Sequence, residues 1–375
     1  MKKILIMYAT YGMGHKKIAE YIEDYFKKEG SFEILCVDIL KYSIPLVGTL
    51  SKKSFEKVNF SIPFLWDITY NAFNKKLKLL PYEKIILGLF KNKKLKNLIL
   101  DFNPDIVIST HWMGSAIIGY HKKKGSLDSK LLTIITDYEA HELWLKNIKY
   151  EDAIIIGNKY EKEMLVKEKN IPKDKIKDFG IPLSNRFNSS YYNRAKTYDK
   201  YKLNKDKKTI LYFCSRGNIT KIYSGAIIKN NLNCNLIIVT GNNSDEKNRL
   251  TKIKKVMNNK NIKILGFVNN VPELLNIADI VVTKPGGATV TECLYFHKPM
   301  LFIGTQSGQE KANAKYLQKY GCAYRSKNEI DMIEFLNLCL IDNKVLSKMT
   351  LKAKSLSKTN AMKKLYEFTN KLISK

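Results

Sequence analysis

Residues 283–300 read T-K-P-G-G-A-T-V-T-E-C-L-Y-F-H-K-P-M, and residues 304–313 continue as G-T-Q-S-G-Q-E-K-A-N. The apolar run at 280–282 is typical of a strand, and a helical pattern follows the two glycines. The glycines therefore mark a strand-to-helix turn, where the backbone can approach a ligand closely. Amides at a helix N-terminus attract phosphate, and Glu292, one turn later, can accept hydrogen bonds from a diol. This combination indicates a nucleotide-sugar site.

A second glycine loop follows the first apolar run of the chain. Residues 3–8 predict a strand, and A-T-Y-G-M-G-H-K-K then leads into a predicted helix over 15–28. A dinucleotide fingerprint would need a third glycine where Lys17 stands, so the loop is not of that type. Gly14 permits a tight turn, and His15 can take a proton from a hydroxyl near neutral pH. From the residues alone, a histidine that caps the helix is the plainer interpretation.

Both motifs resemble those of the diacylglycerol glycosyltransferases, which are related to the peptidoglycan N-acetylglucosaminyltransferase MurG. The resemblance implies an α/β fold of GT-B type, with two Rossmann-like domains facing each other across a cleft that holds the active site. It implies that His15 is the general base. In that family the glycine turn holds the UDP diphosphate, a glutamate binds the ribose and a Gln-Glu pair contacts the sugar. The implied nucleotide-sugar contacts are Gly14, Gly266, Phe267, Val268, Pro285, Gly286, Gly287, Ala288, Thr289, Glu292, Gln309, Glu310 and Asn313.

Two further predicted strands end in polar residues. P-D-I-V-I-S-T-H ends at His111, and T-I-I-T-D ends at Asp137, with His141 and Trp144 following. Both strings resemble segments of the same family. Ligands of open α/β sheets bind outside the carboxyl ends of the strands, so His111, Asp137 and His141 are acceptor-side candidates. The structural alternative, in which Asp137 caps a turn and His141 packs on Trp144, has equal weight.

Composition limits the class of protein. The 375 residues suffice for two domains, and the net charge of +30 suits an anionic membrane or a nucleic acid. No zinc-finger, RNA-binding or basic-zipper motif is recognisable, so nucleic acid is not an expected partner. The histidines and cysteines lack metal-ligand spacing, so neither a bound metal nor another cofactor is expected. No signal peptide or spanning segment is apparent, which predicts a peripheral protein on the cytoplasmic face of the cell membrane.

Residues 44–100 lose the strand pattern and mix aromatic residues with lysines. Basic amphipathic helices with aromatic residues lie in membrane interfaces, and each lysine near an anionic surface contributes about 1 kcal/mol. The resemblance also implies acceptor and membrane contacts in this region. The alternative is an ordinary pair of helices packed on the sheet. The membrane-contact candidates are Phe60, Phe64, Trp66, Phe90, Lys91, Lys93 and Lys94.

Alternating strand and helix patterns divide the chain into two α/β halves. We expect an N-terminal domain that binds acceptor and membrane over 1–190 and a linker over 191–207. A nucleotide-sugar domain over 208–350 follows, and the C-terminal helix over 351–375 crosses back to the first domain. A single last helix is expected over about 343–373.

The resemblance implies a glycosyltransferase that moves a hexose from a UDP-sugar to diacylglycerol, and a single displacement would invert the anomeric centre and form a β-glycoside. The residues leave glucose and galactose equally open as the donor sugar. One alternative is N-acetylglucosaminyl transfer to a polyprenyl-linked peptidoglycan precursor. Another is a UDP-N-acetylglucosamine epimerase, which needs no acceptor. A basic binding protein without catalysis is disfavoured by the presence of His15, Glu292, Gln309 and Glu310.

Overall fold

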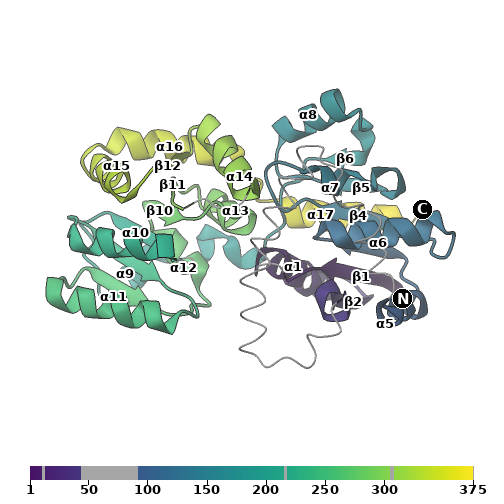
Figure 1. Ribbon diagram of the computed structural model, residues 1–375, viewed down its shortest axis with the longest axis horizontal. Helices are drawn as coiled ribbons and strands as arrows, with labels where there is room; N and C mark the ends of the chain where they lie inside the picture. Colours follow the sequence, from purple (N-terminus) through teal and green to yellow (C-terminus); the bar gives the residue numbers. More distant parts are fainter. Residues whose placement is uncertain (11–12, 44–91, 215–217, 305–307, 375) are drawn as a thin grey trace. The chain divides into compact units, whose positions relative to one another are not determined.

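The computed structural model describes the chain except residues 11–12, 44–91, 215–217, 305–307 and 375 (Figure 1). It divides into two compact α/β units. Unit 1 comprises Met1–Ser184, Ser307–Gln309 and Lys358–Lys375. Unit 2 comprises Asn185–Gln306 and Glu310–Ser357.

Unit 1 contains a parallel six-stranded sheet in the order β2-β1-β3-β4-β5-β6. Its strands are β1 (Lys2–Tyr8), β2 (Phe32–Asp38), β3 (Ile106–Ser109), β4 (Lys130–Ile134), β5 (Ala153–Ile155) and β6 (Ile176–Lys177). Its helices are α1 (Met13–Glu29), α2 (Ile39–Ser43), α5 (Lys93–Phe102), α6 (Trp112–Lys123), α7 (Glu142–Leu145), α8 (Lys159–Lys169) and α17 (Ala361–Ile373). Parallel neighbours need crossover connections, and helices supply most of them.

Helices cover both faces of the unit 1 sheet (Figure 1). Successive residues of a strand point to opposite faces. Leu5 and Met7 of β1 therefore join a core cluster with apolar residues of α5 and α6, whereas the equally buried Ile4 and Ile6 lie outside that cluster. On α17, Tyr366 donates a hydrogen bond of 2.8 Å to the carbonyl oxygen of Glu29, at the end of α1. The N-terminal and C-terminal segments of the chain are thus packed together within unit 1.

Unit 2 contains a second parallel six-stranded sheet, in the order β12-β11-β10-β7-β8-β9. Its strands are β7 (Thr209–Phe213), β8 (Asn235–Val239), β9 (Ile262–Leu265), β10 (Ile280–Thr283), β11 (Met300–Phe302) and β12 (Ala323–Arg325). Its helices are α9 (Arg194–Lys200), α10 (Asn218–Lys229), α11 (Ser244–Met257), α12 (Val271–Ile277), α13 (Gly287–Tyr295), α14 (Gly308–Lys319, in this unit from Glu310 on), α15 (Glu329–Ile341) and α16 (Asn343–Leu356).

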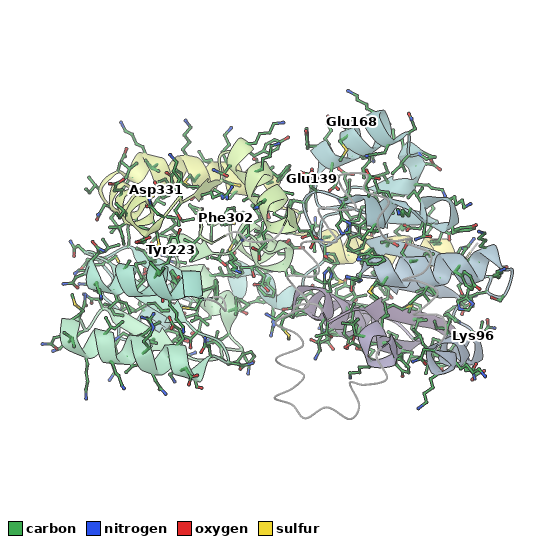
Figure 2. The ribbon with its side chains drawn as sticks, viewed as in Figure 1. Lys96, Glu139, Glu168, Tyr223, Phe302 and Asp331 are labelled. Carbon is green, nitrogen blue, oxygen red and sulfur yellow. The ribbon has the colours of Figure 1, made fainter. Side chains whose placement is uncertain are left out.

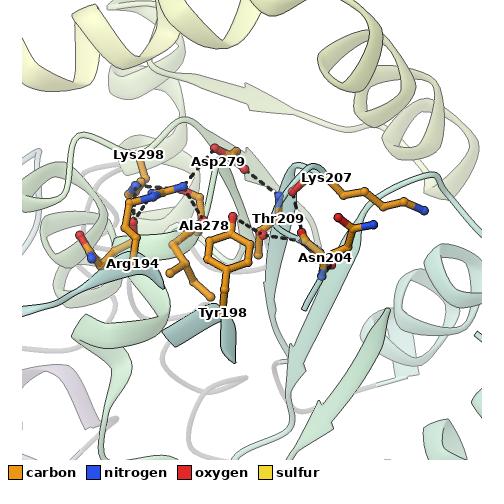
Figure 3. Close-up of polar contacts among 11 residues, drawn as sticks. Arg194, Tyr198, Asn204, Lys207, Thr209, Ala278, Asp279 and Lys298 are labelled. Carbon is orange, nitrogen blue, oxygen red and sulfur yellow. Dashed lines mark hydrogen bonds and ion pairs between the residues drawn. The ribbon is translucent and has the colours of Figure 1, made fainter. Parts of the chain in front are cut away.

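The stretch expected as a linker, residues 191–207, contains α9 and is folded as part of unit 2. The guanidinium of Arg194 lies 3.9 Å from the carboxylate of Asp279 (Figure 3). The hydroxyl of Tyr198 lies 3.1 Å from that of Thr209, at the start of β7. The polar residues that suggest a linker in the sequence therefore tie α9 to the sheet.

The expectation of one long last helix is wrong, because α16 ends at Leu356 and α17 begins at Ala361. Ser357, between them, has extended backbone angles of φ −68° and ψ 137°. The physical reason is that the two helices bury their apolar faces in different cores. Leu346 of α16 packs in the core of unit 2, whereas α17 belongs to unit 1.

The strand order reverses once in each sheet, between β1 and β3 in unit 1 and between β7 and β10 in unit 2. Loops diverge at such a switch point and leave room for a ligand at the carboxyl ends of the strands. The loop after β1 leads to Gly14 and His15, and the loop after β3 carries His111. The Pro-Gly-Gly turn follows β10. Both motifs found in the sequence thus lie at switch points.

Candidate active site

His15 lies in the first turn of α1 and is half-buried. Its Nδ1 is 2.7 Å from the carbonyl oxygen of Thr110 and 2.9 Å from the hydroxyl oxygen of Thr136. A carbonyl oxygen can only accept a hydrogen bond, so we assign the hydrogen to Nδ1. In the neutral ring, Nε2 then has the free lone pair and can accept a proton.

The surroundings of His15 keep its ring neutral near pH 7. Burial lowers the pKa of His15 below its usual value, and the negative charge of Asp137 and the Thr110 carbonyl oppose that shift. A neutral imidazole is the form that acts as a base. Because Asp137 favours the charged form, its carboxylate would also stabilise the imidazolium created when His15 takes a proton.

The structure brings the predicted acceptor-side histidines together with His15. The ring of His111 lies edge-on to that of His15, with 4.8 Å between the centroids. Burial lowers the pKa of His141 to about 3 and that of His111 well below its usual value, and in both cases the positive charge of His15, when that ring is protonated, adds to the effect. Of these three rings, His15 alone has an acidic residue among the main influences on its pKa.

His111 and His141 also have structural roles. His111 is the N-cap of α6, and its Nδ1 accepts a hydrogen bond of 3.3 Å from the backbone amide of Met113. His141 is the N-cap of α7, and its ring centroid lies 5.7 Å from that of Trp144. The packing on Trp144 considered for His141 is therefore present, and the ring of Trp144 also lies 6.4 Å from that of His15 between centroids.

The turn after β10 is open at its glycine. Gly286 is the N-cap of α13, with φ −72° and ψ 136°, which are angles that any residue adopts. A Cβ built on Gly286 would meet no atom within 4 Å. The first hydrogen bond inside the helix runs from Val290 N–H to the carbonyl of Gly286, so the amides of Gly287, Ala288 and Thr289 precede it. Glycine is thus not required here by the fold, and it leaves space in front of these amides.

Helix α14 is tied to the same turn. The side chain of Asn313 is fully buried and donates a hydrogen bond of 3.0 Å from Nδ2 to the carbonyl of Pro285. The ammonium of Lys284 lies 3.9 Å from the carboxylate of Glu310. Asn313 therefore holds the turn in place, and the direct ligand contact implied by the resemblance stays a prediction. Gln309 and Glu310 lie in the first turn of α14.

The remaining donor-side candidates also follow strand ends of unit 2. Gly266, Phe267 and Val268 follow β9, and the Phe267 ring is 62% exposed, which leaves an apolar surface at this edge of the sheet. Thr289 is half-buried in α13. Glu292 is only 4% exposed.

Sequence reasoning does not single out Thr110, Thr136 and Lys284. The two threonines hold His15, and their signal was a hydroxyl residue at the end of each predicted strand. Lys284 precedes the Pro-Gly-Gly turn and places a cation beside it. A lysine directly before a predicted phosphate-binding turn was the available signal, because phosphate recognition commonly uses such a charge.

Lys93 and Lys94 are exposed in the first turn of α5, whereas five of the membrane-contact candidates lie outside the described residues: Phe60, Phe64, Trp66, Phe90 and Lys91. Within the described part of the chain, no helix is both long and apolar enough to cross a membrane. In the same residues, no three His, Cys, Asp or Glu side chains are grouped so as to hold a metal ion.

Comparison with known proteins matches both halves of the chain. Residues 15–183 match the monogalactosyldiacylglycerol (MGDG) synthase family, and residues 215–368 match the glycosyltransferase family 28 C-terminal domain. The processive diacylglycerol beta-glucosyltransferase of Bacillus pumilus is 29% identical over 364 residues, which cover 95% of this chain and 91% of that protein.

Solved structures share the fold. MurG of Acinetobacter baumannii has a TM-score of 0.63 at 15% identity, over 99% of this chain and 100% of that one. The UDP-GlcNAc 2-epimerase of Neisseria meningitidis, bound to UDP-GlcNAc, has a TM-score of 0.60 at 15% identity, over 98% and 100%. At such identities the likeness shows the fold alone.

The fold and the family matches together define a glycosyltransferase of the two-domain, GT-B type. Its N-terminal half is similar to the MGDG synthase family and its C-terminal half to the glycosyltransferase family 28 C-terminal domain. The fold class and the family predicted from the two motifs are thereby confirmed.

The tautomer of His15 can be tested without a substrate. Because the Thr110 carbonyl can only accept, we expect nitrogen NMR of histidine-labelled protein at pH 7 to show His15 neutral and protonated on Nδ1. A His15→Gln sample identifies the resonance. A neutral ring protonated on Nε2 would contradict the assignment, since the proton-accepting lone pair would then face Thr110.

Proposed function

We propose that this enzyme transfers a hexose from a UDP-sugar to the free hydroxyl of diacylglycerol. The observation that carries the proposal is the hydrogen bond from His15 Nδ1 to the Thr110 carbonyl, which leaves Nε2 as the proton acceptor. The lipid acceptor is supported by the MGDG synthase match over the half that contains His15 and by the printed name of the Bacillus pumilus relative.

The proposed reaction is a single displacement. The acceptor oxygen forms a bond to the anomeric carbon as its proton passes to His15 Nε2. The bond from that carbon to the diphosphate oxygen breaks, and UDP leaves with the electron pair. Attack opposite the leaving group inverts the anomeric centre, so a UDP-α-sugar gives a β-glycoside. Asp137 stabilises the imidazolium formed at His15.

In this proposal the charge of the leaving diphosphate is met by protein groups of unit 2. The amides of the first turn of α13 point out of the helix N-terminus, and Lys284, which is paired with Glu310, places a cation beside the turn. Glu292 is assigned to the ribose, and Gln309 and Glu310 to the sugar. No bound metal takes part in the proposed mechanism.

The enzyme is further proposed to work as a peripheral protein on the cytoplasmic face of an anionic membrane. The support is its net charge of +30 and the exposed Lys93 and Lys94 of α5. Lysines near an anionic surface contribute about 1 kcal/mol each, so several together would retain the enzyme at its lipid acceptor. N-acetylglucosaminyl transfer and epimerisation have weaker support, since their representatives share the fold at only 15% identity.

The role of His15 is tested by His15→Ala. Loss of a general base costs about 10²–10⁴-fold in rate, so we expect kcat to fall by about a hundredfold or more. Binding of UDP, measured by calorimetry, should persist because the residues assigned to the diphosphate and the ribose lie in unit 2. His297→Asn is a suitable control, since His297 lies in unit 2 with φ 55°, a left-handed conformation that asparagine tolerates. Turnover unchanged in His15→Ala would remove His15 from the mechanism.

The role of the glycine turn is tested by Gly286→Ala. The fold has room for the added methyl, so we expect the midpoint of thermal unfolding to be unchanged. The methyl would occupy the space assigned to the diphosphate, so the affinity for UDP should fall about tenfold or more, in line with the ~1–3 kcal/mol cost of a misfitted methyl.

Gly180→Ala is the control for a glycine that the fold does require. Gly180 has φ +96°, and a Cβ there would lie 2.4 Å from the Cβ of Lys358. This variant should lose stability and keep its affinity for UDP. Equal UDP affinity in Gly286→Ala and the unaltered protein would show that the diphosphate does not lie against this turn.

A further inference from the structure

The first turn of α8 is hydrogen-bonded to the segment that follows Asp137. The side chain of Asn158, the N-cap of α8, accepts a hydrogen bond of 2.8 Å from the amide of Glu161. Its Nδ2 donates a hydrogen bond of 3.0 Å to the carbonyl of Tyr138. The carboxyl group of Glu161 accepts a hydrogen bond from the backbone amide of Ala140. Two side chains of one helix turn therefore fix the backbone between Asp137 and His141.

Glu161 is an unusual choice for this position if its role is packing alone. Its side chain is 1% exposed, and within the described part of the chain Oε2 has no hydrogen-bond partner. A buried polar group without a partner costs free energy that an apolar side chain of similar volume would not. Burial raises the pKa of Glu161 to about 8, and the nearby charges of Glu139 and Asp137 add to that shift. The group is thus a buried neutral acid near pH 7.

We propose that Glu161, with Asn158, is a positioning residue for the base: it fixes the Tyr138–Ala140 segment so that the Asp137 carboxylate keeps its electrostatic hold on His15. This inference rests on the proposed role of His15. Glu161 itself contacts the backbone of Ala140 and acts through Asp137.

The expected sign follows from the groups around His15. Asp137, in the loop after β4, raises the pKa of His15, whereas His111 at the start of α6 and His141 at the start of α7 are neutral. The side chain of Gln309 also donates a hydrogen bond of 3.0 Å to Oδ2 of Asp137. If the segment after Asp137 loosens, the carboxylate is held from that side alone, its influence on His15 weakens, and the pKa of His15 falls. The acid limb of the pH profile of kcat/KM reports that pKa, so it should move to lower pH.

The experiment compares pH profiles of kcat/KM for the full chain carrying Glu161→Ala, Glu161→Gln or Asn158→Ala. In Glu161→Ala and Asn158→Ala we expect the acid limb to fall by about half a pH unit or more, with UDP affinity unchanged. Glu161→Gln retains an oxygen that accepts from Ala140, so its limb should match that of the unaltered enzyme. Glu168→Ala is the control, because Glu168 is an exposed residue of the same helix (Figure 2).

An acid limb that stays in place in Glu161→Ala would overturn the inference, even if kcat fell, because lost packing alone does not move the limb. Equal shifts in Glu161→Ala and Glu161→Gln would also overturn it. If Glu161→Ala does not fold, Asn158→Ala decides in the same way, with histidine NMR titration of His15 as a second readout. An acid limb that persists in His15→Ala is a different result. It would refute the proposed role of His15, but not the contacts of Glu161 and Asn158 with the Tyr138–Ala140 segment.

Discussion

The hydrogen bond between His15 Nδ1 and the carbonyl of Thr110 is the interaction on which the account of the active site depends. It exists because β1 and β3 pair in parallel, with Met7 opposite Ser109, so that their carboxyl ends meet at one edge of the sheet. The amide of Thr110 completes that ladder with a hydrogen bond of 2.9 Å to Met7. The strand register thereby sets the tautomer of a side chain in the next helix.

The two units have the same sheet topology, but the residues that follow their strands create different electrostatic surroundings. At the switch point of unit 1, burial favours the neutral form of the His15 ring, whereas the negative charge of Asp137 favours the protonated form. At the switch point of unit 2, Gly286 has open space around it at the N-terminus of α13, and Lys284, paired with Glu310, precedes it. In the proposed mechanism, one sheet design thus serves a proton acceptor in one unit and an anion site in the other, depending on which residues follow the strands.

The glycine turns and the strand–helix alternation could be predicted because they are local patterns. The contacts of His15 could not, because Thr110 and Thr136 are 95 and 121 residues away along the chain. The break between α16 and α17 depends on which core each helix packs against. The helical pattern over about 343–373 does not show which core that is, so it predicted one continuous helix. Glu161 had no signal either, since a glutamate in a charged helix is ordinarily a solvated residue.

The central claim is that a hexose passes from a UDP-sugar to a lipid hydroxyl with inversion. The most direct measurement is incubation of the enzyme with labelled UDP-glucose or UDP-galactose and diacylglycerol in anionic vesicles, followed by NMR of the lipid fraction. We expect a labelled glycosyl diacylglycerol with a β linkage. A lipid fraction without label, together with epimerised UDP-N-acetylglucosamine in a parallel reaction lacking acceptor, would contradict it.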